Sequence, residues 1–144
     1  MIYVINSLSD PLIKLVNDDP VRPNIPVEFR VSNDNEIFVL LDSDNLPEAV
    51  VCIAYKDYIP VDEAQLMYAS EIPSTAVFYT IWSYKPGAGR KLIRESKKHI
   101  EMNKPGIVKF VTLSPRTEMA RIFHLKNGAS IFRENETSIN YEYH

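Results

Sequence analysis

Residues 75–93 read TAVFYTIWSYKPGAGRKLI, and this stretch decides the fold. Its first eight residues are β-branched, aromatic or small, which is typical of a buried strand. Two of the four glycines in the whole chain, Gly87 and Gly89, follow a few residues later. Leu92, Ile93 and Ile100 then recur at the spacing of one helix face. The stretch therefore predicts a strand, a glycine turn and an amphipathic helix, in that order.

Positive charge gathers around the same turn. Residues 85–104 carry seven Lys or Arg against two Glu, a net charge of +5 in a chain whose total is −3. Glycines before a helix let backbone N–H groups converge where the helix dipole is positive, so the segment predicts a local anion site. The alternative interpretation is a solvated basic helix face. The P-loop pattern and the G-x-G-x-x-G pattern of dinucleotide-binding folds both fail here, because the required glycine or lysine positions hold other residues.

The rest of the chain predicts a mixed α+β sheet. Strands are expected at residues 2–5, 36–42, 49–56, 75–82 and 107–113, with two more near the C-terminus. Helices are expected after Ser7 or Ser9, over residues 89–103, and from Ser114-Pro115 to Lys126. The strands at 75–82 and 107–113 should be parallel neighbours joined by the helix between them.

Composition sets the class of protein. A length of 144 residues predicts one domain spanning residues 1–144. Cys52 is the single cysteine and lies in an apolar run, so we expect it to be buried, with no disulfide and no metal site. No run is long and apolar enough to span a membrane, and the net charge gives no reason to bind nucleic acid. These observations favour a cytoplasmic protein.

Two motifs carry a family resemblance. Residues 84–92, YKPGAGRKL, resemble the acetyl-coenzyme A loop of the GNAT acetyltransferase superfamily, in which Gln or Arg is followed by two residues, Gly, one residue, and Gly or Ala. Residues 110–130, FVTLSPRTEMARIFHLKNGAS, are similar to its second signature, with Thr117 at the usual Asn and His124 at the usual Tyr. The matching positions of that second signature are Ala120, Phe123, Lys126 and Gly128.

The resemblance implies a fold and an activity. The fold would be GNAT-like: a mixed, mostly antiparallel sheet with a central parallel βαβ crossover, helices on both faces, and a cleft where the two parallel strands part. The activity would be N-acetyltransferase, moving an acetyl group from acetyl-CoA to a small-molecule or peptide amine by direct attack, without a metal; a homodimer is allowed for. The alternative is a catalytically inactive GNAT-fold module that binds coenzyme A or a protein partner.

The resemblance also implies site residues. His124 would protonate the departing thiolate. The base is open among Tyr84, Tyr79, Glu71 and a water chain, because the strand at 75–82 has no carboxylate. Residues implied to bind the cofactor are Ile81, Trp82, Ser83, Lys85, Gly87, Ala88, Gly89, Arg90, Lys91 and Thr117.

Three positions depart from the family pattern. Tyr84 replaces the charged or amide residue, Pro86 offers no N–H, and His124 replaces Tyr, which keeps the inactive module open. The acids Asp62, Glu63 and Glu71 hint at a cationic amine acceptor.

Overall fold

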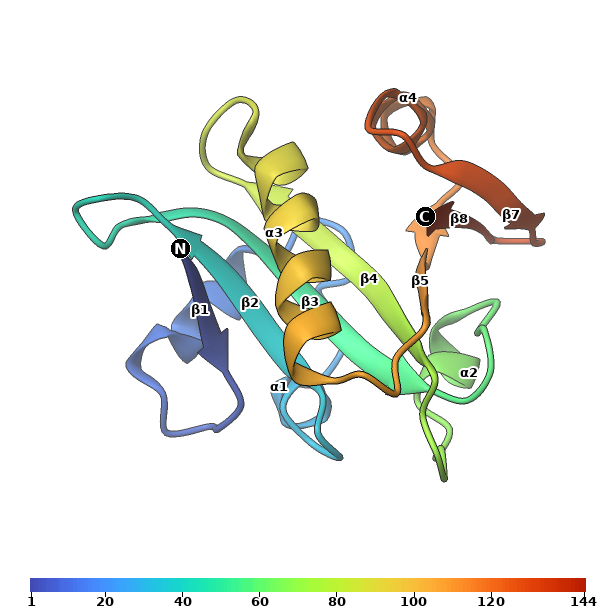
Figure 1. Cartoon of the computed structure of the whole chain (residues 1–144), viewed down its shortest axis with the longest axis horizontal. Helices are drawn as coiled ribbons and strands as arrows, with labels where there is room; N and C mark the ends of the chain where they lie inside the picture. The colour runs from blue at the N-terminus through green and yellow to red at the C-terminus, as the bar shows by residue number, and fades with distance from the viewer.

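Strands of β-branched and aromatic residues build one mixed sheet in the computed structural model, which describes residues 1–144 (Figure 1). The strands are β1 (Ile2–Ile5), β2 (Glu36–Leu41), β3 (Pro47–Lys56), β4 (Thr75–Ser83), β5 (Lys109–Thr112), β6 (Ser114–Pro115), β7 (Ser130–Glu134) and β8 (Ser138–Tyr143). The helices are the 3-10 helix η1 (Pro11–Asp18) and the α-helices α1 (Val27–Arg30), α2 (Glu63–Leu66), α3 (Ala88–Asn103) and α4 (Glu118–Lys126).

The sheet order is β1-β2-β3-β4-β5-β8-β6, with β7 paired to β8. Every pair of neighbours is antiparallel except β4 and β5, which are parallel and are joined by α3. The predicted mixed sheet with a central parallel crossover is therefore confirmed.

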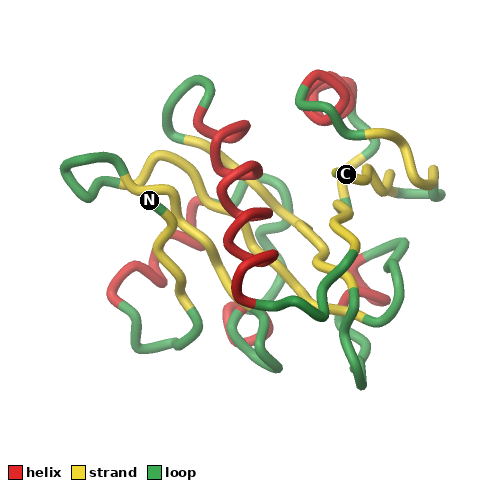
Figure 2. The backbone as a smooth tube through the Cα atoms, viewed as in Figure 1, coloured by secondary structure: helices red, strands yellow, loops and turns green.

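Two apolar clusters cover the two faces of the sheet. On one face Leu92, Ile93 and Ile100 of α3 pack against the strands, and Figure 1 shows α3 crossing in front of β3 and β4. On the other face η1, α1 and α2 contribute the apolar cover. Figure 2 shows how short these three elements are and how much loop connects them. Cys52 lies in this second cluster and is fully buried, as predicted. None of the helices combines the length and the apolarity needed to cross a membrane.

Two predicted helix starts were wrong. Ser114 and Pro115 form the short strand β6, which pairs with β8, and α4 begins later with Thr117 as its N-cap. The Thr117 hydroxyl accepts the N–H of Ala120 at 3.2 Å, so the cap position is taken by the nearest hydroxyl outside the sheet. Near the N-terminus Asp10, rather than Ser7 or Ser9, caps η1 by accepting the N–H of Leu12 at 2.8 Å.

A buried ion pair holds the irregular segment between η1 and α1 against the sheet. The Arg30 Nη1 lies 2.8 Å from the Asp19 Oδ2, and the two side chains are 1% and 0% exposed. Arg30 also donates to the carbonyl oxygens of Arg22 and Ile25 and contacts the Cys52 sulfur at 3.4 Å. Because buried charges are costly unless they are fully partnered, this set of contacts defines the conformation of the whole segment.

We predict that Asp19→Ala lowers the free energy of unfolding by about 3–5 kcal/mol, since it leaves the Arg30 charge buried without its partner. Asp44→Ala, which removes an exposed carboxylate in the β2–β3 turn, should change it by less than about 0.5 kcal/mol. Urea unfolding of both variants at pH 7 measures the difference. Equal losses in the two variants would contradict the assignment.

Candidate functional site

The two parallel strands part after four residue pairs. β4 and β5 are in register from Thr75 opposite Lys109 to Phe78 opposite Thr112, and the last bond runs from the Leu113 N–H to the Phe78 carbonyl at 3.1 Å. Beyond it β4 continues along β3 to Ser83. The segment after β5 turns away from β4 and forms β6, which pairs with β8. Figure 1 shows β4 and β5 diverging from a common lower end. One edge of β4 is thus free of a partner strand, as the resemblance implied.

A β-bulge lies in β4 at the start of this free edge. Against β3, Cys52 pairs with Thr80 and Ile53 pairs with Phe78, so Tyr79 is the extra residue. Consequently Tyr79 and Thr80 both direct their side chains to the face that carries Asp19: Tyr79 joins the second apolar cluster, and the Thr80 hydroxyl donates to Asp19 at 2.8 Å.

Backbone N–H groups of the free edge face away from β3. The Tyr84 N–H donates to the Glu48 carbonyl at 2.8 Å, on the β3 side. Because strand residues alternate between the two edges, the N–H groups of Ile81 and Ser83 point to the opposite side, where β4 has no neighbour. An extended polar ligand can pair with this edge as a strand would.

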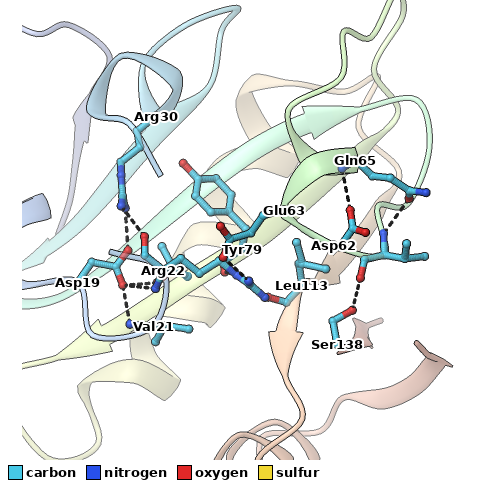
Figure 3. Close-up of polar contacts among 12 residues, drawn as sticks. Asp19, Val21, Arg22, Arg30, Asp62, Glu63, Gln65, Tyr79, Leu113 and Ser138 are labelled. Carbon is cyan, nitrogen blue, oxygen red and sulfur yellow. Dashed lines mark hydrogen bonds and ion pairs between the residues drawn. The ribbon is translucent and has the colours of Figure 1, made fainter. Parts of the chain in front are cut away.

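An arginine occupies the point of divergence (Figure 3). The Arg22 Nε donates to the Tyr79 carbonyl at 2.9 Å, and its Nη2 donates to the Leu113 carbonyl at 2.8 Å. The third contact of the guanidinium is an ion pair with Glu63 at 2.8 Å. The side chain is 10% exposed. Arg22 therefore links the first carbonyl of each strand beyond their last mutual hydrogen bond.

The Asp19 carboxylate fixes the backbone at Arg22 and at the residue before it. Its Oδ1 accepts the N–H groups of Val21 and Arg22 at 2.8 Å and 3.0 Å. Burial alone would raise the pKa of the Asp19 carboxyl, but hydrogen bonds from the Arg22 N–H, Arg30, the Val21 N–H and Thr80 together hold this pKa below its usual value. The carboxylate is consequently charged at neutral pH.

A cleft of about 370 Å³ opens along the free edge of β4. Ten of its eighteen lining residues are hydrophobic, and none is Asp, Glu, Lys or Arg. The lining residues are Pro20, Val21, Phe78, Tyr79, Thr80, Ile81, Trp82, Ser83, Gly89, Ile93, Leu113, Ser114, Pro115, Thr117, Met119, Ala120, Phe123 and His124. The cleft thus suits a largely apolar, uncharged portion of a ligand.

The glycine turn lies where β4 passes into α3. Gly87 is the N-cap of α3 with φ +80°, a left-handed conformation that favours glycine, and no side chain caps the helix. The Ala88 N–H donates to the Lys85 carbonyl at 3.2 Å. The N–H groups of Gly89 and Arg90, in the first turn, have no intrahelical acceptor and are available to an anion.

Gly89 also sets the distance between two helices. A Cβ at this position would lie 3.0 Å from the ring of Phe123 in α4. Substitution here would therefore displace a wall of the cleft as well as fill the turn.

His124 lies on the cleft wall in a chain of hydrogen bonds. Its Nδ1 is 2.7 Å from the Tyr143 hydroxyl, and its Nε2 is 3.1 Å from the Ser114 hydroxyl, which donates to Thr112 at 2.8 Å. Since the Ser114 hydrogen is directed at Thr112, Ser114 accepts from the Nε2–H, and Nδ1 accepts from Tyr143. The ring also stacks on Tyr141 with centroids 4.8 Å apart.

Burial lowers the pKa of His124 to about 4. At pH 7 only about one ring in a thousand would carry the extra proton. His124 is therefore an uncharged hydrogen-bond donor, and its surroundings do not favour the expected role as the acid that protonates a thiolate.

Six of the predicted site residues line the cleft: Ile81, Trp82, Ser83, Gly89, Thr117 and His124. Gly87, Ala88, Arg90 and Lys91 lie in the turn and first helical residues beside it. Lys85 forms an exposed ion pair with Asp42 at 3.0 Å, and hydrogen bonding to that carboxylate raises the pKa of Lys85.

None of the three candidate bases is placed in the cleft in a form that could accept a proton. Tyr84 is not among the lining residues: its hydroxyl donates to Asp18 at 2.7 Å and accepts from the Trp82 indole at 3.1 Å. Tyr79 contributes to the lining, but burial raises the pKa of its hydroxyl well above the usual value. Glu71 is exposed in the loop before β4.

The acids that hinted at a cationic acceptor have other partners. Asp62 caps α2 by accepting the Gln65 N–H at 2.8 Å, and Glu63 pairs with Arg22. That leaves Glu71 alone, so a cationic acceptor has little support.

Sequence reasoning missed Asp19, Arg22 and Arg30. They lie in a proline-rich stretch without periodicity, DDPVRPNIPVEFR at residues 18–30. The one available signal was the presence of two arginines and three acids among apolar and proline residues that form no amphipathic helix.

Two comparisons based on sequence found nothing: no protein-family model and no curated protein matches this chain. Comparison with solved structures found a similar fold in malonyl-CoA decarboxylase from Rhodopseudomonas palustris, with a TM-score of 0.74 and 18% identity over 99% of this chain. The match covers 59% of that chain, so this chain spans less than two thirds of its length.

Acetyltransferases of similar length share the fold. GCN5 from Tetrahymena matches with a TM-score of 0.61 and 15% identity over 100% of this chain and 96% of that one. An acetyltransferase from Bacillus subtilis, solved in complex with CoA, matches with a TM-score of 0.60 and 13% identity over 98% of this chain and 93% of that one. The chain has the GNAT fold.

The His124 environment predicts a pH dependence of stability. Between the pKa near 6.5 of an unfolded histidine and the folded value of about 4, the unfolded state binds more protons. Unfolding free energy should therefore fall by about 3 kcal/mol as the pH drops through this window. Urea unfolding at pH 7, 5.5 and 4.5 measures the fall, and His124→Gln should lack that contribution. Parallel pH profiles for the parent and the variant would contradict the burial effect.

Proposed function

We propose that the cleft binds the pantetheine arm of an acyl-coenzyme A thioester and that the protein transfers the acyl group to an amine. The observation that carries the proposal is the unpaired edge of β4 beyond the Tyr79 bulge, which borders an apolar cleft. Pantetheine carries two amides and one hydroxyl on an otherwise apolar chain, and the Ser83 N–H on the outer part of this edge would pair with one of the amides. The GNAT fold, which includes an acetyltransferase solved with CoA, supports this choice.

The start of α3 would hold the phosphates. Gly89 and Arg90 offer free N–H groups at the positive end of the helix, and Arg90 and Lys91 are exposed cations without an ion-pair partner. Lys85 is less suited, because Asp42 already neutralises it. Pro86 contributes no donor.

The reaction would need few protein groups. The thioester supplies an activated carbonyl carbon; the amine forms a bond to it, the carbon–sulfur bond breaks, and the amine proton leaves as the thiol forms. N–H groups on the β4 edge would stabilise charge on the carbonyl oxygen. His124, whose single N–H is already donated to Ser114, would hold Ser114 and Tyr143 in place rather than act as a proton donor. Since the lining has no carboxylate, a water molecule or the bulk solvent would take the amine proton.

Decarboxylation of a malonyl thioester is a second candidate. It is favoured by the lack of any charged residue in the cleft lining and by the uncharged pair His124 and Ser114. In that reaction the carbon–carbon bond breaks, carbon dioxide leaves, the electron pair passes to the thioester oxygen, and a proton then adds to carbon. No general base is required, and a dry apolar cleft destabilises the reacting carboxylate. The malonyl-CoA decarboxylase structures have the same fold.

One pair of assays separates the two reactions. Acyl transfer should release free thiol from acetyl-CoA only when an amine is present, whereas decarboxylation should convert malonyl-CoA to acetyl-CoA without free thiol. Mass spectrometry and thiol titration follow both products. Coenzyme A binding with neither reaction, over a panel of small and peptide amines, would contradict both proposals and favour the binding module.

Charge reversal tests the phosphate site. Arg90→Glu should raise the dissociation constant for coenzyme A by about tenfold or more, because it replaces a cation by an anion beside the free N–H groups. Lys98→Glu makes the same charge change farther along α3, on an exposed position, and serves as the matched control. Isothermal titration calorimetry measures both. Equal effects in the two variants would mean that the site lies elsewhere.

A further inference from the structure

Arg22 occupies a place that no backbone group could fill. The last hydrogen bond between β4 and β5 uses the Leu113 N–H and the Phe78 carbonyl. The next groups on the two sides are the carbonyls of Tyr79 and Leu113, and both are acceptors, so they cannot satisfy each other. The guanidinium donates to both at 2.9 Å and 2.8 Å. A planar group with donors in a fixed fork thus holds the two strands at a set separation.

Both ends of Arg22 are themselves held in place. Asp19 accepts its backbone N–H at 3.0 Å, and Arg30 donates to its carbonyl at 2.9 Å. At the other end Glu63 pairs with Nη1 of the guanidinium, while Nε and Nη2 donate to the strand carbonyls (Figure 3). The neighbouring residues Pro20 and Val21 line the cleft. Arg22 therefore contacts the backbone of residues that line the cleft, namely Tyr79 and Leu113.

We propose that Arg22 is a positioning residue for the carbonyl of the bound thioester. By fixing the Tyr79 carbonyl it holds the β4 bulge, and the bulge sets where the N–H of Ile81, the first outward N–H beyond it, points. This inference rests on the proposed function, because it assigns the Ile81 N–H to the acyl carbonyl of an acyl-CoA ligand. Arg22 itself acts through the backbone and does not touch the reacting atoms.

Binding of an acyl-CoA would then have two separate contributions, one from coenzyme A and one from the acyl carbonyl. The phosphates and most of the pantetheine contact α3 and the outer part of the β4 edge, away from Arg22. The acyl carbonyl depends on the alignment that Arg22 maintains. Loss of Arg22 should therefore weaken recognition of the carbonyl much more than recognition of coenzyme A itself.

The test compares two ligands by isothermal titration calorimetry: coenzyme A, and acetonyl-CoA, a stable ketone that carries a carbonyl beyond the sulfur. Arg22→Gln should raise the dissociation constant for acetonyl-CoA by about tenfold while changing that for coenzyme A by less than about twofold. Arg22→Lys keeps the charge and reaches one carbonyl, so it should fall between parent and Gln. Arg94→Gln, at an exposed position on α3, is the matched control and should change neither constant.

Each outcome has a defined meaning. Equal rises for both ligands in Arg22→Gln, or no rise for either, would overturn the positioning role while leaving the coenzyme A site intact. A parent protein that binds neither ligand would overturn the proposed function itself, and this inference with it. If Arg22→Gln does not fold, Arg22→Lys carries the same comparison, with a rise of about threefold for acetonyl-CoA alone expected.

Glu63→Gln separates the strand contacts from the ion pair. It removes the charge partner of Arg22 but leaves both carbonyl contacts, and Glu63 lies outside the cleft lining. If positioning comes from the carbonyl contacts, this variant should keep the parent's preference for acetonyl-CoA to within about twofold. A loss as large as that in Arg22→Gln would assign the effect to the ion pair and overturn the proposed geometry.

Discussion

Because of the bulge at Tyr79, the carbonyl oxygens of Tyr79 and Leu113 face each other where β4 and β5 stop pairing, and the rest of this structure depends on how those oxygens are satisfied. Here Arg22 donates to both. A buried carbonyl without a donor is costly, so without such a group the strands would either close or admit water. The guanidinium keeps the split open, and the split is what turns one edge of β4 toward a cleft. The segment between η1 and α1 is held in the position that delivers this side chain, through contacts of Asp19 and Arg30 with the Arg22 backbone.

Delivering a charged side chain to a nearly buried position requires further charges. Asp19 holds the backbone of Arg22 and pairs with Arg30, which returns a hydrogen bond to the Arg22 carbonyl. Each member satisfies donors or acceptors of the others, so the cluster avoids most of the penalty for burying ions. Thr80, beside the bulge, completes the cluster by donating to Asp19. The same residues thus stabilise an irregular loop and define the strand geometry that a thioester ligand would use.

The cleft is chemically sparse. Its polar groups are backbone amides, hydroxyls and the uncharged His124, while the cations lie outside it in the first turn of α3. That division matches a ligand with an anionic end and an apolar, amide-bearing arm. Acyl transfer and decarboxylation, the two proposed reactions, both use polarisation of a thioester carbonyl, and neither would obtain a charged base from the cleft.

Local pattern alone was sufficient for the strands, the central helix α3, the parallel crossover and the glycine turn, because each depends on periodicity or on the conformational freedom of glycine within a few residues of chain. The resemblance to the GNAT family also implied that Ile81, Ser83, Gly89 and His124 would lie at one site, and all four line the cleft. The roles of His124 and Tyr84 needed the tertiary structure, since burial determines the charge of the first and a hydrogen bond to Asp18 turns the second away. Arg22 and its partners also needed it: the two carbonyls it joins lie 57 and 91 residues further along the chain, and no local pattern specifies contacts at that separation.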